Sequence, residues 1–202
     1  MCAQEALLQL ELDKVVLVPV GEAPHRELET DPGPEARLEM VELAIADDER
    51  FAVSRVEIDR EGPSYTADTL RELRAAEPDD ELFLILGGDQ AATLPKWHEP
   101  EAVLEMAQVA VVERTNWSRN AVGISVGRLK GADRIRYLDM PTMQVSSTSV
   151  RRRVAAGLPI RYLVPDRVAN HIGVNDLYRE PAARASPGSP GAGAPAVAEA
   201  ST

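Results

Sequence analysis

A run of hydroxyl residues near the end of the chain is the stretch best suited to bind an anion. Ser147 and Thr148 stand where a helix should begin, because Ser and Thr side chains accept hydrogen bonds from the unpaired N–H groups of a first turn. Such a helix start favours phosphate through its free N–H groups and its dipole, and Arg151 adds a fixed positive charge one turn later. Gly157 is expected to close this helix.

The same residues taken alone would also suit a capped surface helix with a basic face. Arg152 and Arg153 continue the positive run, and we expect both on the solvated face of that helix.

Two further groups follow apolar runs, at the places where strands should end. Gly87 and Asp89 come directly after the run at 81–86; glycine lets the backbone pass close to a ligand, and a carboxylate accepts hydrogen bonds from ribose hydroxyls. His25 and Arg26 lie in a polar loop after the run at 14–19. In open α/β sheets the carboxyl ends of strands are where ligands bind. An ordinary turn and a solvated loop are the competing interpretations.

The elements that must position these residues alternate along the chain. Continuous short apolar runs are typical of parallel strands buried on both faces, and strands alternating with helices predict a doubly wound, Rossmann-like α/β fold. Strands are expected at 14–19, 51–58, 81–86, 108–112 and 135–138. Helices are expected at 2–11, at 34–45, in a segment that runs to residue 76, at 99–106, from the hydroxyl run to Gly157, and at 165–172. Ser64 or Thr66 should cap the third helix. The connection at 115–132 is expected to lack chemistry, with Trp117 in local packing.

Length and composition restrict the class of protein. The 202 residues fit one domain at 1–179, followed by a disordered Ala/Pro/Gly/Ser-rich tail at 180–202. A net charge of −11 argues against general nucleic-acid binding, although a small phosphorylated ligand needs only a few local cations. No apolar run approaches the length of a membrane span. The residues after Met1 form an amphipathic stretch with Glu5 and Glu11 and no basic region, so no signal peptide is expected. The single cysteine, Cys2, suits a reducing cytoplasm.

Several of these segments resemble, in order, those of bacterial nicotinate mononucleotide adenylyltransferases, from residue 2 to about residue 178. The hydroxyl run resembles the I-S-S-T-x-x-R motif of nucleotidyltransferases. The other matching segments are Ala23-Pro24-His25-Arg26, Ser64-Tyr65-Thr66-Ala67-Asp68-Thr69-Leu70, Gly87-Gly88-Asp89, Leu94-Pro95-Lys96-Trp97-His98 and Arg161-Tyr162-Leu163-Val164-Pro165.

The resemblance implies a reaction and two sets of site residues. The family transfers the adenylyl group of ATP to nicotinate mononucleotide, with Mg²⁺ accompanying ATP. Residues that would bind ATP are His25, Arg26, Gly87, Asp89, Ser147, Thr148 and Arg151, and those that would bind nicotinate mononucleotide are Thr66, Trp97 and His98. Trp97, one of only two tryptophans, would stack on the pyridine ring rather than pack under its loop. A homo-oligomer is left open, and no protein ligand for a metal is named.

The sequence departs from the family at its start. The family opens with a strand and G-G-T-F-D-P-x-H-x-G-H, whereas residue 2 already lies past this motif, and the three histidines form no H-x-G-H. The resemblance thus implies that the first strand, central between 14–19 and 81–86, is missing. Two alternatives stay open: an inactive remnant that binds nucleotide, and transfer to another phosphorylated acceptor such as phosphopantetheine. The Ser64–Thr66 segment together with Trp97 favours nicotinate.

Overall fold

The computed structural model describes residues 1–23, 31–112, 118–141 and 145–179. The α-helices are α1 (Cys2–Gln9), α2 (Pro34–Ile45), α3 (Thr66–Ala76), α4 (Gly88–Thr93), α5 (Pro100–Met106), α6 (Arg119–Val126), α7 (Ser147–Ala155) and α8 (Asp166–Val174). The strands are β1 (Val15–Leu17), β2 (Phe51–Val53), β3 (Phe83–Gly87), β4 (Gln108–Val112) and β5 (Ile135–Leu138), with short 3₁₀ turns η1 (Leu94–Lys96) and η2 (Ala132–Arg134).

All of these strand pairs are parallel, as the alternation of strands and helices predicts. β1 pairs with β2 in the register Val15↔Phe51, whereas β3, β4 and β5 form a separate sheet in that order. Within that sheet Phe83 lies opposite Gln108, and Val109 opposite Ile135. The mixed α/β class with helical crossovers is therefore confirmed.

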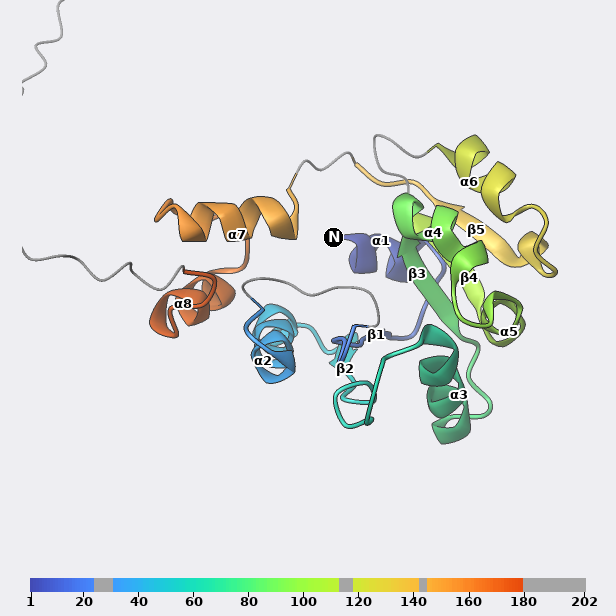
Figure 1. Ribbon diagram of the computed structural model, residues 1–202, viewed down its shortest axis with the longest axis horizontal. Coiled ribbons are helices and arrows are strands. Elements are labelled where there is room, and N and C mark those ends of the chain that lie inside the picture. Colours follow the sequence, from blue (N-terminus) through green and yellow to red (C-terminus); the bar gives the residue numbers. More distant parts are fainter. Residues whose placement is uncertain (24–30, 113–117, 142–144, 180–202) are drawn as a thin grey trace, which may run out of the picture.

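The two sheets differ in how well their strands are covered. β4 has a strand on each side, and its residues 109–112 are at most 1% exposed. Every residue of β3 is only half-buried, since within the described chain β4 is its only neighbouring strand. In Figure 1 the β1–β2 pair lies beside the larger sheet and not within it. A central strand between the two sheets stays a prediction.

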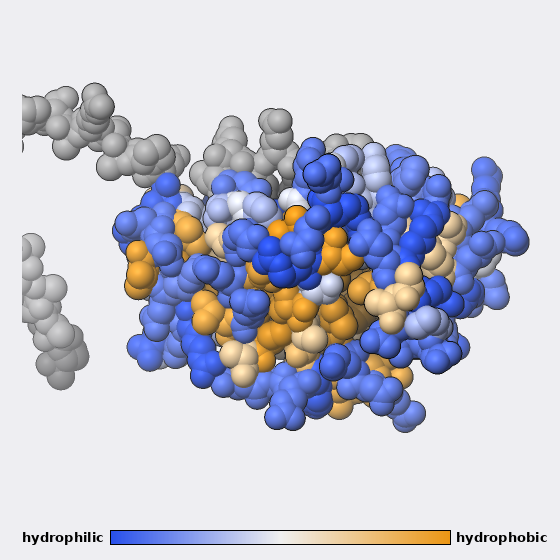
Figure 2. Space-filling model, turned by 90° about the horizontal axis from the view of Figure 1, so that it is seen from below, coloured by the Kyte–Doolittle hydropathy of each residue, from blue (hydrophilic) through white to orange (hydrophobic). Residues whose placement is uncertain are grey.

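Three apolar clusters hold the helices. The largest contains Leu104 and joins α3, α5 and α6 to β4, and a second packs α1 against β4 and β5. The third unites α7 and α8 with Met40 and Leu43 of α2 on the opposite side of the molecule (Figure 1). Seen from the side of α2 and α3, apolar side chains gather at the centre of the surface (Figure 2). In β1, Val16 remains 43% exposed.

The strand expected at 51–58 is wrong in its length. β2 stops at Val53, and the chain then turns, with the N–H groups of Ile58 and Asp59 donating to the carbonyl of Arg55 at 2.8 and 2.9 Å. The Arg55 guanidinium bonds Asp59 across this turn and also Glu35 of α2. The bonds of Arg55 to Glu35 and Asp59 therefore outweigh the strand propensity of residues 54–58.

The connection at 115–132 is also different from the expectation, because it contains α6. Ser118 caps this helix by accepting a hydrogen bond from the Ala121 N–H at 3.3 Å, and Val122 and Val126 are buried in the largest cluster. Its glycine content concealed a helix that tertiary packing stabilises. Trp117 and the tail at 180–202 lie outside the described residues.

Helices α1 and α3 both begin without a side-chain cap. α3 begins at Thr66 and ends at Ala76, where its end was predicted, but its N-cap residue is Tyr65, so the predicted cap by Ser64 or Thr66 is wrong. α1 has no side-chain cap, in agreement with its sequence. Over the part of the chain that the structure describes, no helix is both long and apolar enough to cross a membrane.

Candidate functional site

The hydroxyl run forms a helix start closed by its own residues. Ser146 accepts a hydrogen bond from the N–H of Ser149 at 3.1 Å, while the Ser149 hydroxyl accepts one from the N–H of Ser146 at 3.1 Å, a reciprocal capping box. The cap is thus Ser146, which leaves the exposed side chains of Ser147 and Thr148 outside the capping bonds. The predicted helix is confirmed, and its first turn has two exposed hydroxyls.

The other end of α7 is closed as Gly157 predicts. Gly157 has φ 68°, and the N–H groups of Gly157 and Leu158 donate to the carbonyls of Val154 and Arg153 at 2.9 and 2.8 Å. Glycine adopts this left-handed conformation without a steric cost, and the two bonds satisfy carbonyls at the helix end. α7 is therefore capped at both ends within this chain.

Arg151 is half-buried and only weakly held. Its Nη2 lies 3.4 Å from the Thr148 hydroxyl, and it forms no ion pair with any described carboxylate. Arg152 is exposed, as expected, but Arg153 donates from Nε to the carbonyl of Pro159 at 2.9 Å. Expecting Arg153 in solvent was therefore wrong: it fastens the chain that leaves α7. Of the three arginines, Arg151 is the one whose guanidinium lies beside a hydroxyl of the first turn of α7, Thr148.

The surroundings of Arg151 are built by α2 and the end of the chain. Burial raises the pKa of Tyr178, while the nearby charge of Arg151 acts to lower it. The Tyr178 hydroxyl lies 3.9 Å from the Met40 sulfur, and both side chains pack against the cluster that includes Val150. Arg151 thus stands next to helix α2 as well as at the start of α7.

Gly87 and Asp89 lie at the carboxyl end of β3. Gly87 is the last residue of the strand, and Asp89 is in the first turn of α4, half-buried. The predicted placement at a strand end is thus found, although no hydrogen bond or ion pair between described residues joins this group to α7. His25 and Arg26 fall outside the described residues. Their proposed role in ATP binding stays a prediction.

The residues predicted for nicotinate mononucleotide converge at the start of α3. Thr66 opens the helix, and the ring of Tyr65 just before it lies 4.5 Å from that of His98, centroid to centroid. Arg71 of α3 holds the next residue of the loop, Glu99, through an ion pair. Two segments about 30 positions apart in the sequence numbering are therefore held side by side, with Thr66 next to the residue whose ring contacts His98.

Trp97 lies in the same loop with its ring half-buried. Its indole N–H donates to the Thr93 hydroxyl at 3.0 Å, and the ring packs against the largest cluster. Packing beneath the loop is what this conformation shows, and stacking on a pyridine ring stays a prediction.

Sequence reasoning assigned no role to Arg37 or to Tyr65. Tyr65 stands within the Ser64–Thr66 segment, so an aromatic side chain immediately before a ligand-binding helix start was the available signal. Arg37 interrupts a helix that is otherwise apolar on its inner side, which was a weaker signal.

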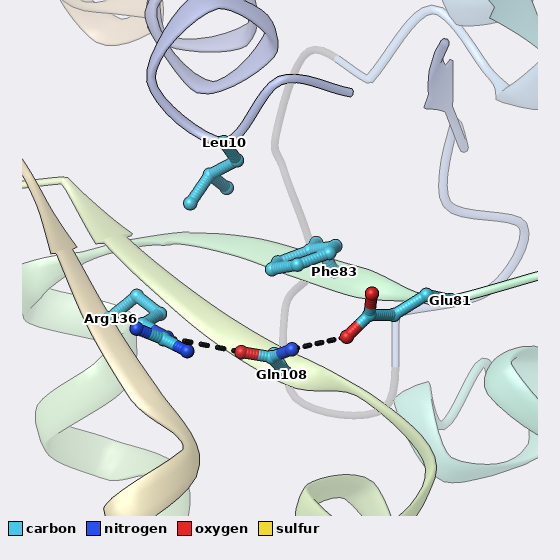
Figure 3. Close-up of a pocket in the computed structure, with 5 residues that line it drawn as sticks. All are labelled: Leu10, Glu81, Phe83, Gln108 and Arg136. Atoms are coloured by element: carbon cyan, nitrogen blue, oxygen red, sulfur yellow. Dashed lines mark hydrogen bonds between the residues drawn. The ribbon is translucent and has the colours of Figure 1, made fainter. Parts of the chain in front are cut away.

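A cavity of about 320 Å³ lies at the other edge of the larger sheet. Figure 3 shows Arg136, Gln108 and Glu81 joined in a row by hydrogen bonds, with Phe83 and Leu10 beside them. Leu10 follows α1, and the other four residues lie at or just before the amino ends of β3, β4 and β5, whereas the candidate site lies at carboxyl ends. The cavity is therefore separate from the predicted chemistry. The described residues also contain no group of three or more His, Cys, Asp or Glu side chains placed to hold a metal ion.

Comparison with known proteins agrees with this architecture. Residues 1–153 match the model of the "Cytidylyltransferase-like" family, more than half of the chain. The chain belongs to this family of nucleotidyltransferases. A relative from Synechococcus sp. (strain JA-3-3Ab), named "Probable nicotinate-nucleotide adenylyltransferase", is 40% identical over 179 residues, 89% of this chain and 86% of its own. A relative of the same name from Roseiflexus sp. (strain RS-1) is 40% identical over 88% of each chain.

A solved structure supports the fold of this family member. It is that of Plasmodium falciparum nicotinic acid mononucleotide adenylyltransferase complexed with NaAD, with a TM-score of 0.67, 14% sequence identity, and coverage of 87% of this chain and 90% of that one. At this identity the likeness concerns the fold, and it confirms the expected Rossmann-like architecture.

Proposed function

We propose that this protein is a nicotinate-nucleotide adenylyltransferase, which converts ATP and nicotinate mononucleotide to the deamido dinucleotide and pyrophosphate. The observation that carries the proposal is the 40% identity, over 88 to 89% of the chain, to relatives with that name. The structure supports it with a phosphate-ready helix start and an aromatic cluster on a separate loop.

The chemistry requires no nucleophile from the protein. An oxygen of the mononucleotide 5′-phosphate attacks the α-phosphorus of ATP, a new P–O bond forms, and the bond from this phosphorus to the bridging oxygen breaks. Pyrophosphate leaves with the electron pair. Because the attacking group is already an anion, catalysis depends on alignment of the two phosphates and on neutralisation of the leaving charge.

The predicted site residues would form two groups, one for each substrate. Ser147, Thr148 and Arg151 would hold the phosphates of ATP with hydroxyls, helix N–H groups and a free guanidinium. Gly87 and Asp89 would bind its nucleoside, with His25 and Arg26 as further ATP ligands. Thr66, Trp97 and His98 would bind the nicotinate end of the other substrate.

Mg²⁺ would enter with ATP, because its usual partners are phosphate oxygens and water rather than a protein cage. The ion would neutralise phosphate charge. We also propose a cytoplasmic location, because a chain with the single cysteine Cys2 suits a reducing compartment.

A second candidate is a nucleotide-binding module without turnover. It is favoured by one observation: the three histidines of the printed chain form no H-x-G-H, the motif on which the family's catalysis depends. This module would use the same ATP ligands, so binding and turnover have to be measured separately.

The test is to incubate the 202-residue chain with Mg·ATP and nicotinate mononucleotide and to measure pyrophosphate and the deamido dinucleotide. Phosphopantetheine replaces the mononucleotide in a parallel reaction. Release with nicotinate mononucleotide alone supports the proposal, whereas release only with phosphopantetheine reassigns the acceptor. Calorimetric ATP binding without any release identifies the module, and neither binding nor release overturns both candidates.

A further inference from the structure

Arg37, in the first turns of α2, ties together two segments at the end of β1. Its Nη2 donates to the carbonyls of Val20 and Gly21 at 2.7 and 3.0 Å. Its Nη1 donates to both carboxylate oxygens of Asp31, at 2.6 Å for Oδ2. One guanidinium thus joins the residues that follow β1 to the residue three places before α2.

Packing alone gives no reason for an arginine at this position. The side chain is only 18% exposed, and its Nε is buried without a hydrogen-bond partner. A buried donor without a partner costs free energy that an apolar side chain would avoid. The use of the arginine must therefore be sought in what it binds: the two carbonyls after β1, which join these segments, and the carboxylate of Asp31.

The helix that carries Arg151 packs against the helix that carries Arg37, because Val150, next to Arg151, belongs to the cluster against which Met40 of α2 packs. The charge of Arg151 also acts on the Asp31 carboxyl. Burial is the largest single influence on this carboxyl and would raise its pKa, but the hydrogen bonds from Arg37 and Gly33 and the charges of Arg37 and Arg151 together outweigh burial, so the pKa is lowered. The carboxylate is thus hydrogen-bonded to one arginine and is influenced by the charge of a second.

We propose that Arg37 is a positioning residue for phosphate binding: by holding both oxygens of Asp31, it keeps this carboxylate from pairing with Arg151. The inference rests on the proposed function, in which Arg151 is a phosphate ligand. It adds a residue that touches no substrate and acts through two others.

The reason is competition for one guanidinium. Carboxylates and phosphates bind arginine through the same paired N–H···O bonds, so an Asp31 released from Arg37 would occupy the donors that phosphate needs. Removing Arg37 should therefore weaken phosphate binding, and removing the charge of Asp31 as well should restore it. A residue that only stabilises the fold would not be rescued in this way.

The experiment measures the Mg·ATP dissociation constant of the full chain by calorimetry. We expect Arg37→Met to weaken binding about fivefold to tenfold and Arg37→Met/Asp31→Asn to return within about twofold of Asp31→Asn alone. Arg37→Lys keeps a charge beside Asp31 and should bind nearly as the unmodified chain does. Arg55→Met is the matched control: Arg55 also pairs with carboxylates, Glu35 of α2 and Asp59, so its loss should leave ATP binding unchanged.

A second measurement needs no ligand. Urea midpoints of Asp31→Asn, Arg151→Met and the double variant give the coupling between Asp31 and Arg151, which should grow when Arg37→Met is added. Unchanged ATP binding in Arg37→Met overturns the proposal, as does a loss that Asp31→Asn fails to restore or a coupling that does not grow. If even the unmodified chain does not bind ATP, the proposed function falls, while the urea series still decides the role of Arg37.

Discussion

The two sheets are stabilised in different ways, the larger one of β3, β4 and β5 and the smaller pair of β1 and β2. β4 is almost fully buried and helices α3, α5 and α6 pack around it, whereas in β1 only Val15 is buried. The smaller pair is held by arginine bonds, from Arg37 to the residues after β1 and from Arg55 to α2. The proposed nicotinate site therefore rests on apolar burial, and the proposed phosphate site depends on polar contacts and on the α7–α8–α2 cluster.

The largest expected effect tests the apolar half. Leu104→Ala truncates a side chain that is 0% exposed in the largest cluster, so the free energy of unfolding should fall by about 2 to 5 kcal/mol. Leu158→Ala is the matched control, because Leu158 follows α7 and is 50% exposed; its loss should change stability by less than about 0.5 kcal/mol. Urea denaturation measures both, and equal losses would contradict the contrast between the two halves.

Arg151→Ala should act on binding instead of stability. Loss of a charge-assisted hydrogen bond to phosphate costs roughly 1.5 to 3 kcal/mol, which is on the order of tenfold to a hundredfold in the ATP dissociation constant. Calorimetry checks this, with the exposed neighbour replaced in Arg152→Ala as a control of similar charge. An Arg151→Ala chain that binds ATP normally would remove the phosphate assignment.

The start of α7 separates stability from ligand binding. Ser146→Ala deletes the capping bond to Ser149 and should cost about 1 kcal/mol of folding free energy. Ser147→Ala, one residue later, leaves the capping box intact and should leave the urea midpoint nearly unchanged. The reverse order of the two midpoints would show that Ser147, not Ser146, holds this helix start.

Trp97→Ala sharpens the comparison on the nicotinate side. If the indole stacks on the pyridine ring, affinity for nicotinate mononucleotide should fall by about twofold to tenfold, the equivalent of ~0.5 to 1.5 kcal/mol. ATP affinity should hardly change. Equal losses for both ligands would indicate that the ring serves packing, in line with its contacts to the largest cluster.

The smallest effect is an acid dependence that belongs to the polar half. Because the folded protein lowers the pKa of Asp31 below its ordinary 3.8, ionised Asp31 adds stability above that value, and the contribution is lost as the pH falls through the folded pKa. The urea midpoint should therefore decline on acidification, and less steeply in Asp31→Asn. Identical pH profiles for the two chains would exclude this contribution.

Those parts of the fold that depend on local pattern were predictable. β4 follows from the apolar run at 109–112, β5 was placed at its observed bounds although it contains Arg136, and α7 follows from its hydroxyls and Gly157. β2 was predicted too long because the Arg55 side chain bonds Glu35 and Asp59, and both partners lie outside the apolar run at 51–58. α6 was missed because its stability comes from burial of Val122 and Val126, which a window rich in glycine does not reveal.

The site divides along similar lines. Residue types alone indicated the proposed phosphate-binding helix start, and the family resemblance pointed to Thr66 and His98. Neither predicted the contact between Tyr65 and His98, because it depends on how two segments distant in sequence fold together. Arg37 was beyond sequence reasoning because two of its partners are backbone carbonyls, which carry no mark of residue type.

Because the chain itself closes both ends of α7, this helix is ordered before a ligand arrives. Binding of a phosphate would then require little loss of backbone entropy, and most of the free energy of the new hydrogen bonds would appear as affinity. Calorimetry on this site should show a small change in heat capacity, since folding of the helix would not accompany binding. Amide hydrogen exchange in α7 would accordingly be slow already in the free protein.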